Sequence, residues 1–358
     1  MERQQLKESS LNELLPEFLL SKIFSKSSSI VNYHHNNLII RPYWFTASIK
    51  PVQDDTLTLA TVVESKDLNH LIKLAELYQG SISATLLVPS TTGMMDNEYI
   101  RQQLRQIRHI YETTSILKRH VDLHLVLQPD MNPSSNRMSY QQARNLARLF
   151  GRTDYIAFIP VSILWITTHI KDSFKDHQSI LKEGNVLVIP TFGFTFDEQQ
   201  NLTLPIDKQS ITEWVEEGKI GLLDEHYELN HGPTSYLHWK EAVEPYLVPT
   251  YDTQYGPIYI FSRLNHPWCE ERFEDDLASC LYTTYLAGAD LWVLPNDFVI
   301  RTHYDETVLS TLQQRKIYNR LVRRYRIEQC VFYARQFDQY QATFNKTQHI
   351  KQECSKNI

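Results

Sequence analysis

A regular alternation of short apolar strands and amphipathic helices between residues 56 and 159 is the feature that most constrains how this chain folds. The first unit joins the β-branched run 56–63 to a helix over 68–78, which begins after Asp67 and ends at Gly80. Alternation at such short intervals predicts a mostly parallel sheet with helices on both faces. The same pattern predicts further strands at 82–89, 121–127 and 155–159, and further helices at 98–118 and 139–150.

The second half of the chain shows a weaker pattern. Strands are predicted at 186–190 and 291–294, helices at 210–218 and 277–287, and residues 224–260 are predicted to be rich in loops. The apolar run 155–166 is predicted to be a buried strand and its continuation, because a membrane span needs about 20 apolar residues.

No internal repeat or linker divides the chain. We predict an N-terminal appendage over 1–50, an α/β domain over 51–305, and a C-terminal helical extension and tail over 306–358. The carboxyl ends of parallel strands are where such sheets bind ligands, so the site is expected after the strand 155–159.

Charge and cysteine content exclude several classes of protein. The chain has 36 Lys and Arg residues against 42 Asp and Glu residues, a net charge of −6, which argues against a nucleic-acid partner. Its four cysteines are too few for a disulfide scaffold, and they lack the close pairs of a zinc site. Two alternatives stay open: one bridge among Cys269, Cys280 and Cys330, or three free buried thiols.

Seven short motifs stand in a characteristic order along the chain. In that order, over about residues 40–335, they resemble glycosyltransferase family 49, which includes the LARGE-type and related glucuronyltransferases that modify dystroglycan, and fungal members are the most similar. The motifs are Arg41-Pro42-Tyr43-Trp44-Phe45, Tyr78-Gln79-Gly80-Ser81-Ile82-Ser83, Arg144-Asn145-Leu146-Ala147-Arg148, Arg152-Thr153-Asp154-Tyr155, His231-Gly232-Pro233-Thr234, Pro267-Trp268-Cys269-Glu270-Glu271-Arg272-Phe273 and Val293-Leu294-Pro295-Asn296-Asp297-Phe298.

The resemblance implies a GT-A fold, a Rossmann-like sheet that binds a sugar nucleotide. It also implies a UDP-sugar donor, a glycan or glycoprotein acceptor, and a divalent cation such as Mn²⁺ held by an Asp-x-Asp motif. Two carboxylates one residue apart at a strand end can bind a hard cation, which neutralises the departing diphosphate. In this chain that position reads Pro160-Val161-Ser162, so both carboxylates are absent.

Two further departures point the same way. The family's glycine-containing loop is replaced by the shorter segment 273–277, which has no glycine. The family's metal-binding histidine aligns with Arg301, and His303, two residues further on, is an alternative ligand. The sequence therefore predicts a retained scaffold without the usual metal site, and we assign no metal ligand.

Six residues are predicted to bind the nucleotide sugar: Thr61, Arg144, Asn145, Pro160, Ser162 and Arg301. The Arg144 guanidinium can bind a diphosphate in a bidentate manner, although a surface arginine on an amphipathic helix has the same pattern. Arg301 can meet the diphosphate charge in place of the metal, or it is a neutral replacement that followed the loss of the metal.

The carboxylates Glu274, Asp275 and Asp276 are the catalytic candidates, either as a general base for a sugar hydroxyl or as a replacement metal ligand. Acidic residues before a helix are also expected from the helix dipole alone. His231 and Thr234 are predicted on the acceptor side of the cleft, although a His-Gly-Pro sequence also makes a tight turn without any ligand.

Two functions from different classes follow. The first is a glycosyltransferase that moves a sugar from a nucleotide-sugar donor to a glycan acceptor without a metal. The second is a catalytically inactive relative that binds a glycan, a nucleotide or a protein through the old cleft. The resemblance suggests the Golgi lumen, although neither an anchor nor a signal peptide is visible in the sequence.

Overall fold

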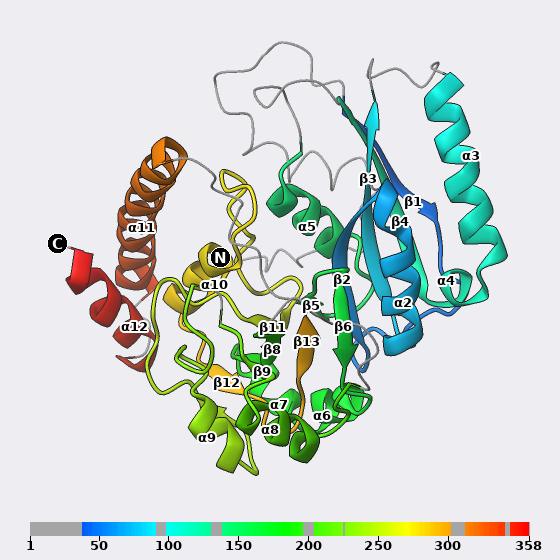
Figure 1. The fold of residues 1–358 in the computed structure, drawn as a ribbon. Coiled ribbons are helices and arrows are strands. Elements are labelled where there is room, and N and C mark those ends of the chain that lie inside the picture. Colours follow the sequence, from blue (N-terminus) through cyan, green and yellow to red (C-terminus); the bar gives the residue numbers. More distant parts are fainter. Residues whose placement is uncertain are drawn as a thin grey trace, which may run out of the picture.

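A large mixed sheet runs through the computed structural model, which describes residues 38–90, 98–129, 138–195, 204–224, 226–301, 312–340 and 344–357. Within these ranges nine strands form the sheet, in the order β1-β4-β3-β2-β5-β11-β7-β12-β10 (Figure 1). The strands are β1 (Ile39–Phe45), β4 (Val121–Pro129), β3 (Ile82–Ser90), β2 (Leu57–Glu64), β5 (Tyr155–Phe158), β11 (Ile258–Ser262), β7 (Val186–Ile189), β12 (Leu291–Val293) and β10 (Tyr246–Leu247).

The four strands β4, β3, β2 and β5 are parallel, as the alternation predicted. Seven of the eight residues of β2 are buried, because helices cover both faces of the sheet and leave no solvated side. The α/β fold, a Rossmann-like and mostly parallel arrangement in this half with helices on both faces, is confirmed.

Helices cover the two faces of the parallel strands unequally. On one face lie α2 (Leu68–Tyr78), α3 (Glu98–Thr113) and α4 (Ser115–His120), whose Leu71, Ile107 and Leu117 join the main core (Figure 1). On the other face α5 (Tyr140–Leu149) packs Leu146 against the strands. The prediction of one helix over 98–118 was wrong, because Thr114 is extended and separates α3 from α4.

The C-terminal half of the sheet contains a strand that the sequence analysis missed. β11 lies antiparallel between β5 and β7, although the segment 224–260 was predicted to be rich in loops. The predicted continuation of the strand 155–159 was also wrong, since a turn after β5 leads into β6 in a second sheet. That sheet has the order β6-β13-β8-β9, formed by β6 (Ile163–Ile166), β13 (Val299–Arg301), β8 (Thr191–Phe194) and β9 (Ile220–Leu222).

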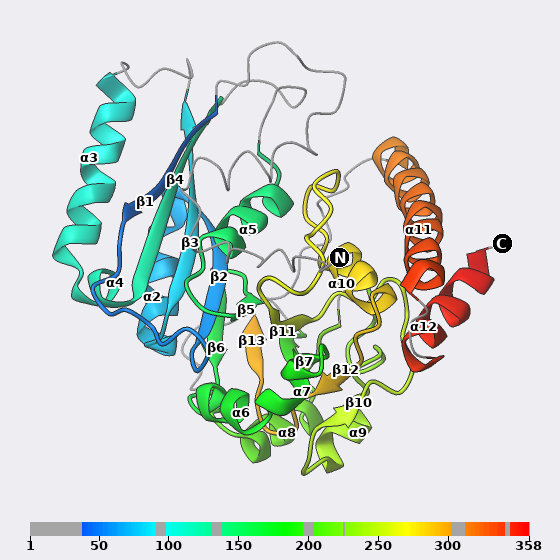
Figure 2. The ribbon, with the colours of Figure 1, turned by 180° about the vertical axis from the view of Figure 1, so that it is seen from behind.

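Helices at the C-terminal end pack against α10 (Leu277–Leu286), and both views place them at the opposite end of the molecule from α3 (Figure 2). α11 (Leu312–Tyr340) and α12 (Phe344–Cys354) contribute Tyr325 and Ile350 to a cluster with Tyr282 of α10. Shorter helices complete the described part: α6 (Ile170–Asp176), α7 (Gln178–Lys182), α8 (Lys208–Glu216) and α9 (Tyr236–Glu241).

Two disulfides join the cysteines, Cys269 to Cys280 and Cys330 to Cys354. The first is one bridge among the three cysteines considered from the sequence, so the alternative of three free thiols was wrong. The second, between α11 and α12, was not anticipated, because it pairs Cys330 with a residue in the C-terminal tail.

The boundaries of the α/β unit extend beyond the parallel strands. β1 pairs with β4, so the large sheet begins before residue 51, within the segment predicted as an appendage. The division into three domains is otherwise still a prediction. In the parts of the chain that the structure describes, none of the helices has both the length and the apolar character needed to span a membrane.

Candidate functional site

The carboxyl ends of the parallel strands meet at one edge of the sheet, which we call the carboxyl edge. β2 ends there at Glu64, and the N-terminus of α5 lies beside it, because the Tyr140 hydroxyl donates to Glu64 Oε1 at 2.7 Å. Thr61 links β2 to the end of β5, donating to the Ile159 carbonyl oxygen at 2.8 Å. Its side chain is buried, so this hydrogen bond between strands accounts for its hydroxyl.

The predicted residues Pro160, Ser162 and Arg301 come together at this edge. Pro160 and Ser162 lie in the half-buried turn between β5 and β6. β13 pairs with β6 so that Arg301 lies opposite Ile163, the residue after Ser162. The pairing therefore brings a cation, across 138 positions of sequence, next to the place where the family pattern has its Asp-x-Asp motif.

The residues at that place do not fit a divalent cation. Pro160 offers no side-chain ligand, and Ser162 offers one neutral hydroxyl, whereas Mg²⁺ and Mn²⁺ prefer anionic oxygens. Among the described residues, no group of three or more His, Cys, Asp or Glu side chains is arranged to hold a metal ion. His303, the alternative ligand, lies outside the described residues.

Arg144 and the acidic cluster meet at the seam between α5 and the segment before α10. The Arg144 guanidinium forms an ion pair with Asp275 and donates to Gln141 Oε1 at 2.8 Å. The Arg144 side chain is 12% exposed and that of Asp275 is 41% exposed, so the pair opens to solvent mainly through the carboxylate. Two predicted site residues are thus in contact, although they neutralise each other's charge.

The other two candidate carboxylates, Glu274 and Asp276, have different hydrogen bonds and different exposure. Asp276 is buried and caps α10, since its Oδ1 accepts from the Ser279 N–H at 3.0 Å and its Oδ2 accepts from the Tyr318 hydroxyl at 2.6 Å. The helix-terminus explanation therefore accounts for Asp276. Glu274 has an exposed side chain, and its backbone carbonyl accepts from the Gln141 N–H at 3.1 Å.

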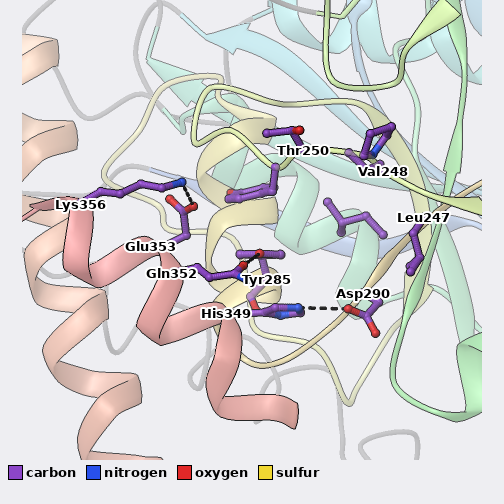
Figure 3. A pocket seen from close by; sticks show the side chains of 12 residues that line it. Leu247, Val248, Thr250, Tyr285, Asp290, His349, Gln352, Glu353 and Lys356 are labelled. Atoms are coloured by element: carbon purple, nitrogen blue, oxygen red, sulfur yellow. Dashed lines mark hydrogen bonds and ion pairs between the residues drawn. The ribbon is translucent and has the colours of Figure 1, made fainter. Parts of the chain in front are cut away.

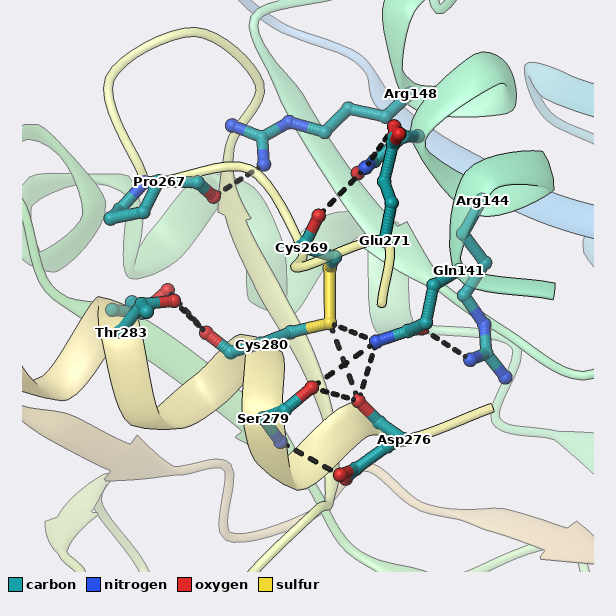
Figure 4. The surroundings of a disulfide bond; sticks show 12 residues. Gln141, Arg144, Arg148, Pro267, Cys269, Glu271, Asp276, Ser279, Cys280 and Thr283 are labelled. Atoms are coloured by element: carbon teal, nitrogen blue, oxygen red, sulfur yellow. Dashed lines mark hydrogen bonds between the residues drawn. A yellow bond between two sulfur atoms is a disulfide. The ribbon is translucent and has the colours of Figure 1, made fainter. Parts of the chain in front are cut away.

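Asn145 lies one residue from Arg144 but points into the protein. Its side chain is buried, and its amide nitrogen donates to the Cys269 carbonyl oxygen at 2.8 Å and to Glu271 Oε1 at 3.1 Å. These bonds hold the segment 269–271 against α5, beside the Cys269–Cys280 disulfide (Figure 4). The contacts seen are those of a residue that positions this segment.

The acceptor-side candidates, His231 and Thr234, have different environments. His231 is exposed, whereas Thr234 is fully buried and donates to Asp224 through both its N–H, at 2.8 Å, and its hydroxyl, at 2.6 Å. Burial raises the pKa of Asp224 to about 6. The turn at Gly232 packs directly on Asp224. A tight turn without a ligand therefore explains the presence of Thr234, but it does not explain His231.

Two residues of this region were not assigned a role from the sequence. Asp224 gives no local signal, because its partner Thr234 is brought to it only by the fold. Arg148 belonged to a family motif and is fully buried. Its guanidinium donates to three backbone carbonyls of the segment 263–267 at 2.6–2.7 Å, and Figure 4 shows the bond to Pro267.

Comparisons with known proteins concern the same region. A family model described as "Glycosyl-transferase for dystroglycan" matches residues 130–334. No curated protein matches. Among solved structures, TarS of S. aureus is similar at 13% identity with a TM-score of 0.38, over 77% of this chain and 39% of that chain. A structure of GalNAc-T7 with UDP, GalNAc and Mn²⁺ is similar at 12% identity with a TM-score of 0.38, over 70% of this chain and 44% of that chain. This chain therefore spans less than half of the length of either.

Proposed function

Because that family model matches more than half of its residues, the chain belongs to glycosyltransferase family 49, and we propose that it transfers a sugar from a UDP-sugar to a glycan acceptor without a metal. The family makes sugar transfer the general activity. The carboxyl edge of the sheet is the proposed donor site, since sheets of this kind bind ligands there.

The observation that carries the proposal is the position of Arg301. A departing nucleoside diphosphate accumulates negative charge, and a fixed guanidinium can stabilise that charge in place of a cation. Arg301 lies opposite Ile163, directly after the Pro160-Val161-Ser162 turn, where the family pattern has metal-binding carboxylates. Arg144, at the nearby seam, is the second cation proposed to contact the diphosphate.

The chemical step is a displacement at the anomeric carbon of the donor sugar. The bond from that carbon to the diphosphate oxygen breaks, a bond to the acceptor hydroxyl oxygen forms, and the hydroxyl proton passes to a carboxylate. Glu274 is the proposed base, because its side chain is exposed, whereas Asp275 is paired with Arg144 and Asp276 is engaged as a helix cap. His231, which is exposed, is proposed to contact the acceptor.

The compartment is part of the proposal. The described residues contain two disulfides, Cys269–Cys280 and Cys330–Cys354, and structural disulfides form and persist in oxidising compartments. Together with the family, this supports the lumen of the secretory pathway, such as the Golgi, as the place where the chain works.

A second candidate function, non-catalytic binding through the same cleft, is favoured by one specific contact. Arg144 is already paired with Asp275, so in this conformation neither is free to bind a phosphate or accept a proton. A family member that has lost catalysis needs neither side chain for the reaction, so the ion pair between Arg144 and Asp275 would not impair it.

A binding titration distinguishes the metal-free enzyme from the non-catalytic binding protein. The full chain is titrated with UDP and with a panel of UDP-sugars, once in Mn²⁺ and once in a chelator. We expect UDP binding that is unchanged by the chelator, and product formation with a glycan acceptor in the same buffer. Arg301→Ala should weaken UDP binding about tenfold or more, because it removes charge-assisted hydrogen bonds. Arg105→Ala, on an exposed part of α3, is the matched control and should leave the affinity unchanged.

Each other outcome excludes a candidate. A strict requirement for Mn²⁺ contradicts the metal-free proposal. UDP binding without any product contradicts the enzyme and favours the second candidate. Absence of UDP binding contradicts the donor site proposed at the carboxyl edge and the proposed role of Arg301 and Arg144 in binding the diphosphate.

A further inference from the structure

Exposed apolar side chains are concentrated on two short parts of the chain. Eleven large apolar side chains are exposed among the described residues, and seven of them lie either between residues 237 and 247 or on α11. Isolated apolar residues are ordinary on a protein surface, whereas groups of them mark interaction sites. The seven are Leu237, Val243, Leu247, Ile317, Ile327, Val331 and Phe332.

The outward face of α11 carries both apolar and basic side chains. Its members are exposed and recur every three or four residues, which puts them on one side of the helix. The opposite side packs against α10 through the buried Tyr325, so this face points away from the rest of the molecule. We call it the α11 surface, and its members are Ile317, Arg320, Arg324, Ile327 and Val331.

The α11 surface is strongly positive. Five exposed cations lie on it or beside it: Lys316, Arg320, Arg323, Arg324 and Arg335. Within the described part of the chain none of the five forms an ion pair. The exposed carboxylate Glu328, on the same helix, is already paired with Arg272 at 2.7 Å. Positive charge without a counter-charge, in a chain whose net charge is −6, favours an acidic partner for this surface.

The segment 237–247 has the complementary composition. Three apolar and two acidic side chains are exposed there: Leu237, Glu241, Val243, Glu244 and Leu247. Neither glutamate forms an ion pair with any residue that the structure describes. Lys240, in the same segment, is paired with Glu216 of α8. We call this segment the α9–β10 surface, and it joins exposed apolar area to uncompensated negative charge.

α12 separates the two surfaces within one copy of the chain. It is bonded to α11 through the Cys330–Cys354 disulfide. Its residues His349 and Gln352 line a cavity together with Leu247 of the α9–β10 surface (Figure 3). Figure 1 and Figure 2 also place α12 between α11 and α9. Contact between the two surfaces therefore requires two copies of the chain.

We propose that the chain self-associates head to tail, with the α11 surface of one copy packed on the α9–β10 surface of the next. The arginines then meet the two glutamates, and the apolar side chains of both surfaces leave water. Two α11 surfaces do not suit each other, because pairing them brings like charges together. Since the two surfaces differ, the contact is heterologous, and each copy keeps one surface for a further neighbour. Neither surface contains a residue of the proposed donor site, so self-association does not depend on sugar transfer.

Sedimentation velocity of the full chain over a range of concentrations tests the proposal. The mean mass should exceed that of the monomer and rise with concentration, and about 0.5 M NaCl should reduce the association by screening the charges. The triple variant Arg320→Glu, Arg323→Glu and Arg324→Glu should associate about tenfold more weakly, because like charges then face each other. The double variant Glu241→Arg with Glu244→Arg should be weakened in the same way.

Mixing the two charge-reversed variants is the decisive measurement. The reversed surface of each then meets a surface of opposite charge on the other, so the mixture should regain association that neither variant shows alone. The matched control is Arg101→Glu, Arg105→Glu and Arg108→Glu, three exposed arginines of α3, which change the net charge by the same amount as the α11 triple variant. It should associate like the unchanged chain.

A substitution without any change of charge tests the apolar part of the contact. Val243 is 80% exposed, so Val243→Ser should leave thermal unfolding unchanged and weaken association about threefold. Thermal unfolding also shows whether each charge-reversed variant folds.

Three results overturn the proposal. The first is a monomer at every concentration. The second is association that both charge-reversed variants retain, or that their mixture does not regain. The third is a monomeric chain that sediments with vesicles containing phosphatidylserine, but not with pure phosphatidylcholine vesicles, and loses this binding in the α11 triple variant, since the α11 surface then serves a membrane.

Discussion

The parallel half of the sheet and the segment from β11 to α12 are held together by different means. In β2, β3 and β4 the strands are continuous apolar runs, and Leu59, Leu86 and Leu125 are fully buried between helices and neighbouring strands. In the later segment, the fully buried Arg263 and two disulfides lie among the apolar residues.

The two regions differ in how easily their residues can be replaced. A core of apolar side chains tolerates substitutions of similar size, so the fold of the parallel half does not depend on particular polar residues. The later segment depends on specific polar partners, and it carries the Arg301 and Asp275 positions where this chain departs from the family pattern. If the two regions differ in this way, substitutions in them should differ in their effect on stability.

Replacing Arg148 should give the largest loss of stability. Its guanidinium joins α5 to the carbonyls of Arg263, His266 and Pro267 and lies 4.1 Å from the Trp268 ring centroid. Arg148→Met leaves three buried carbonyls without donors, so we expect a loss of about 4 kcal/mol in the free energy of unfolding. Denaturant titration measures the loss.

The matched control for this change is Arg105→Met, since Arg105 is exposed on α3. It should change the free energy of unfolding by less than about 0.5 kcal/mol. Equal effects of the two substitutions would show that the buried arginine does not hold the seam.

Removing the disulfide between α11 and α12 should have the next largest effect. It closes a loop with a sequence separation of 24, for which chain entropy gives about 3.5 kcal/mol. We expect the double variant Cys330→Ser with Cys354→Ser to lose that amount in thermal or denaturant unfolding. Leu86→Ala in β3 should cost a comparable amount, about 3 kcal/mol, but its cost should be the same with and without a reductant. A reductant-dependent cost for Leu86→Ala would break the comparison.

Acid should weaken both regions, because each contains a buried neutral histidine. In the later segment His266 accepts from the Ser262 N–H at 2.9 Å and lies 3.0 Å from the Gly184 carbonyl oxygen through its other nitrogen. Burial lowers the pKa of His266 to about 4 and that of His124, in β4, to about 3. Each folded pKa lies below the ordinary value of 6.5, so the unfolded chain binds a proton first.

The free energy of unfolding should therefore be at its full value above pH 6.5 and fall as the pH drops toward 4. For His266 alone the loss is about 3 kcal/mol over this range, from 1.4 kcal/mol for each unit of pKa difference. Unfolding measured at pH 7, 5.5 and 4.5 tests this, and His266→Gln should reduce the slope by one proton. An unchanged slope in that variant would contradict a neutral buried His266.

The smallest effect should come from Asp275. Its ion pair with Arg144 is partly solvent-exposed, so Asp275→Asn should change the free energy of unfolding by about 1 kcal/mol or less. The same change releases Arg144, and UDP affinity should rise about threefold or more, since charge-assisted bonds to phosphate become available. Isothermal titration measures the affinity. A fall in affinity would remove Arg144 from the donor site.

Local patterns predicted the parallel half well and the later half poorly. The strands and helices between β2 and β5 follow from periodicity, although the break at Thr114 was missed. β11 was missed because its residues stand in an aromatic segment with prolines and polar turns around it. The run Pro257-Ile258-Tyr259-Ile260-Phe261 was the available signal, since β-branched and aromatic residues favour strands.

The sequence by itself determined the α/β class and, through the order of its motifs, the family, because periodicity and motif order are properties of the linear chain. It also showed that the Asp-x-Asp carboxylates are absent. Only the tertiary structure decided that Arg301 lies beside the residues that replace them, that Arg144 pairs with Asp275, and that Cys330 bonds to Cys354. Strand register, ion pairing and disulfide pairing join residues far apart in sequence. Such contacts depend on how whole elements pack, which no local pattern records.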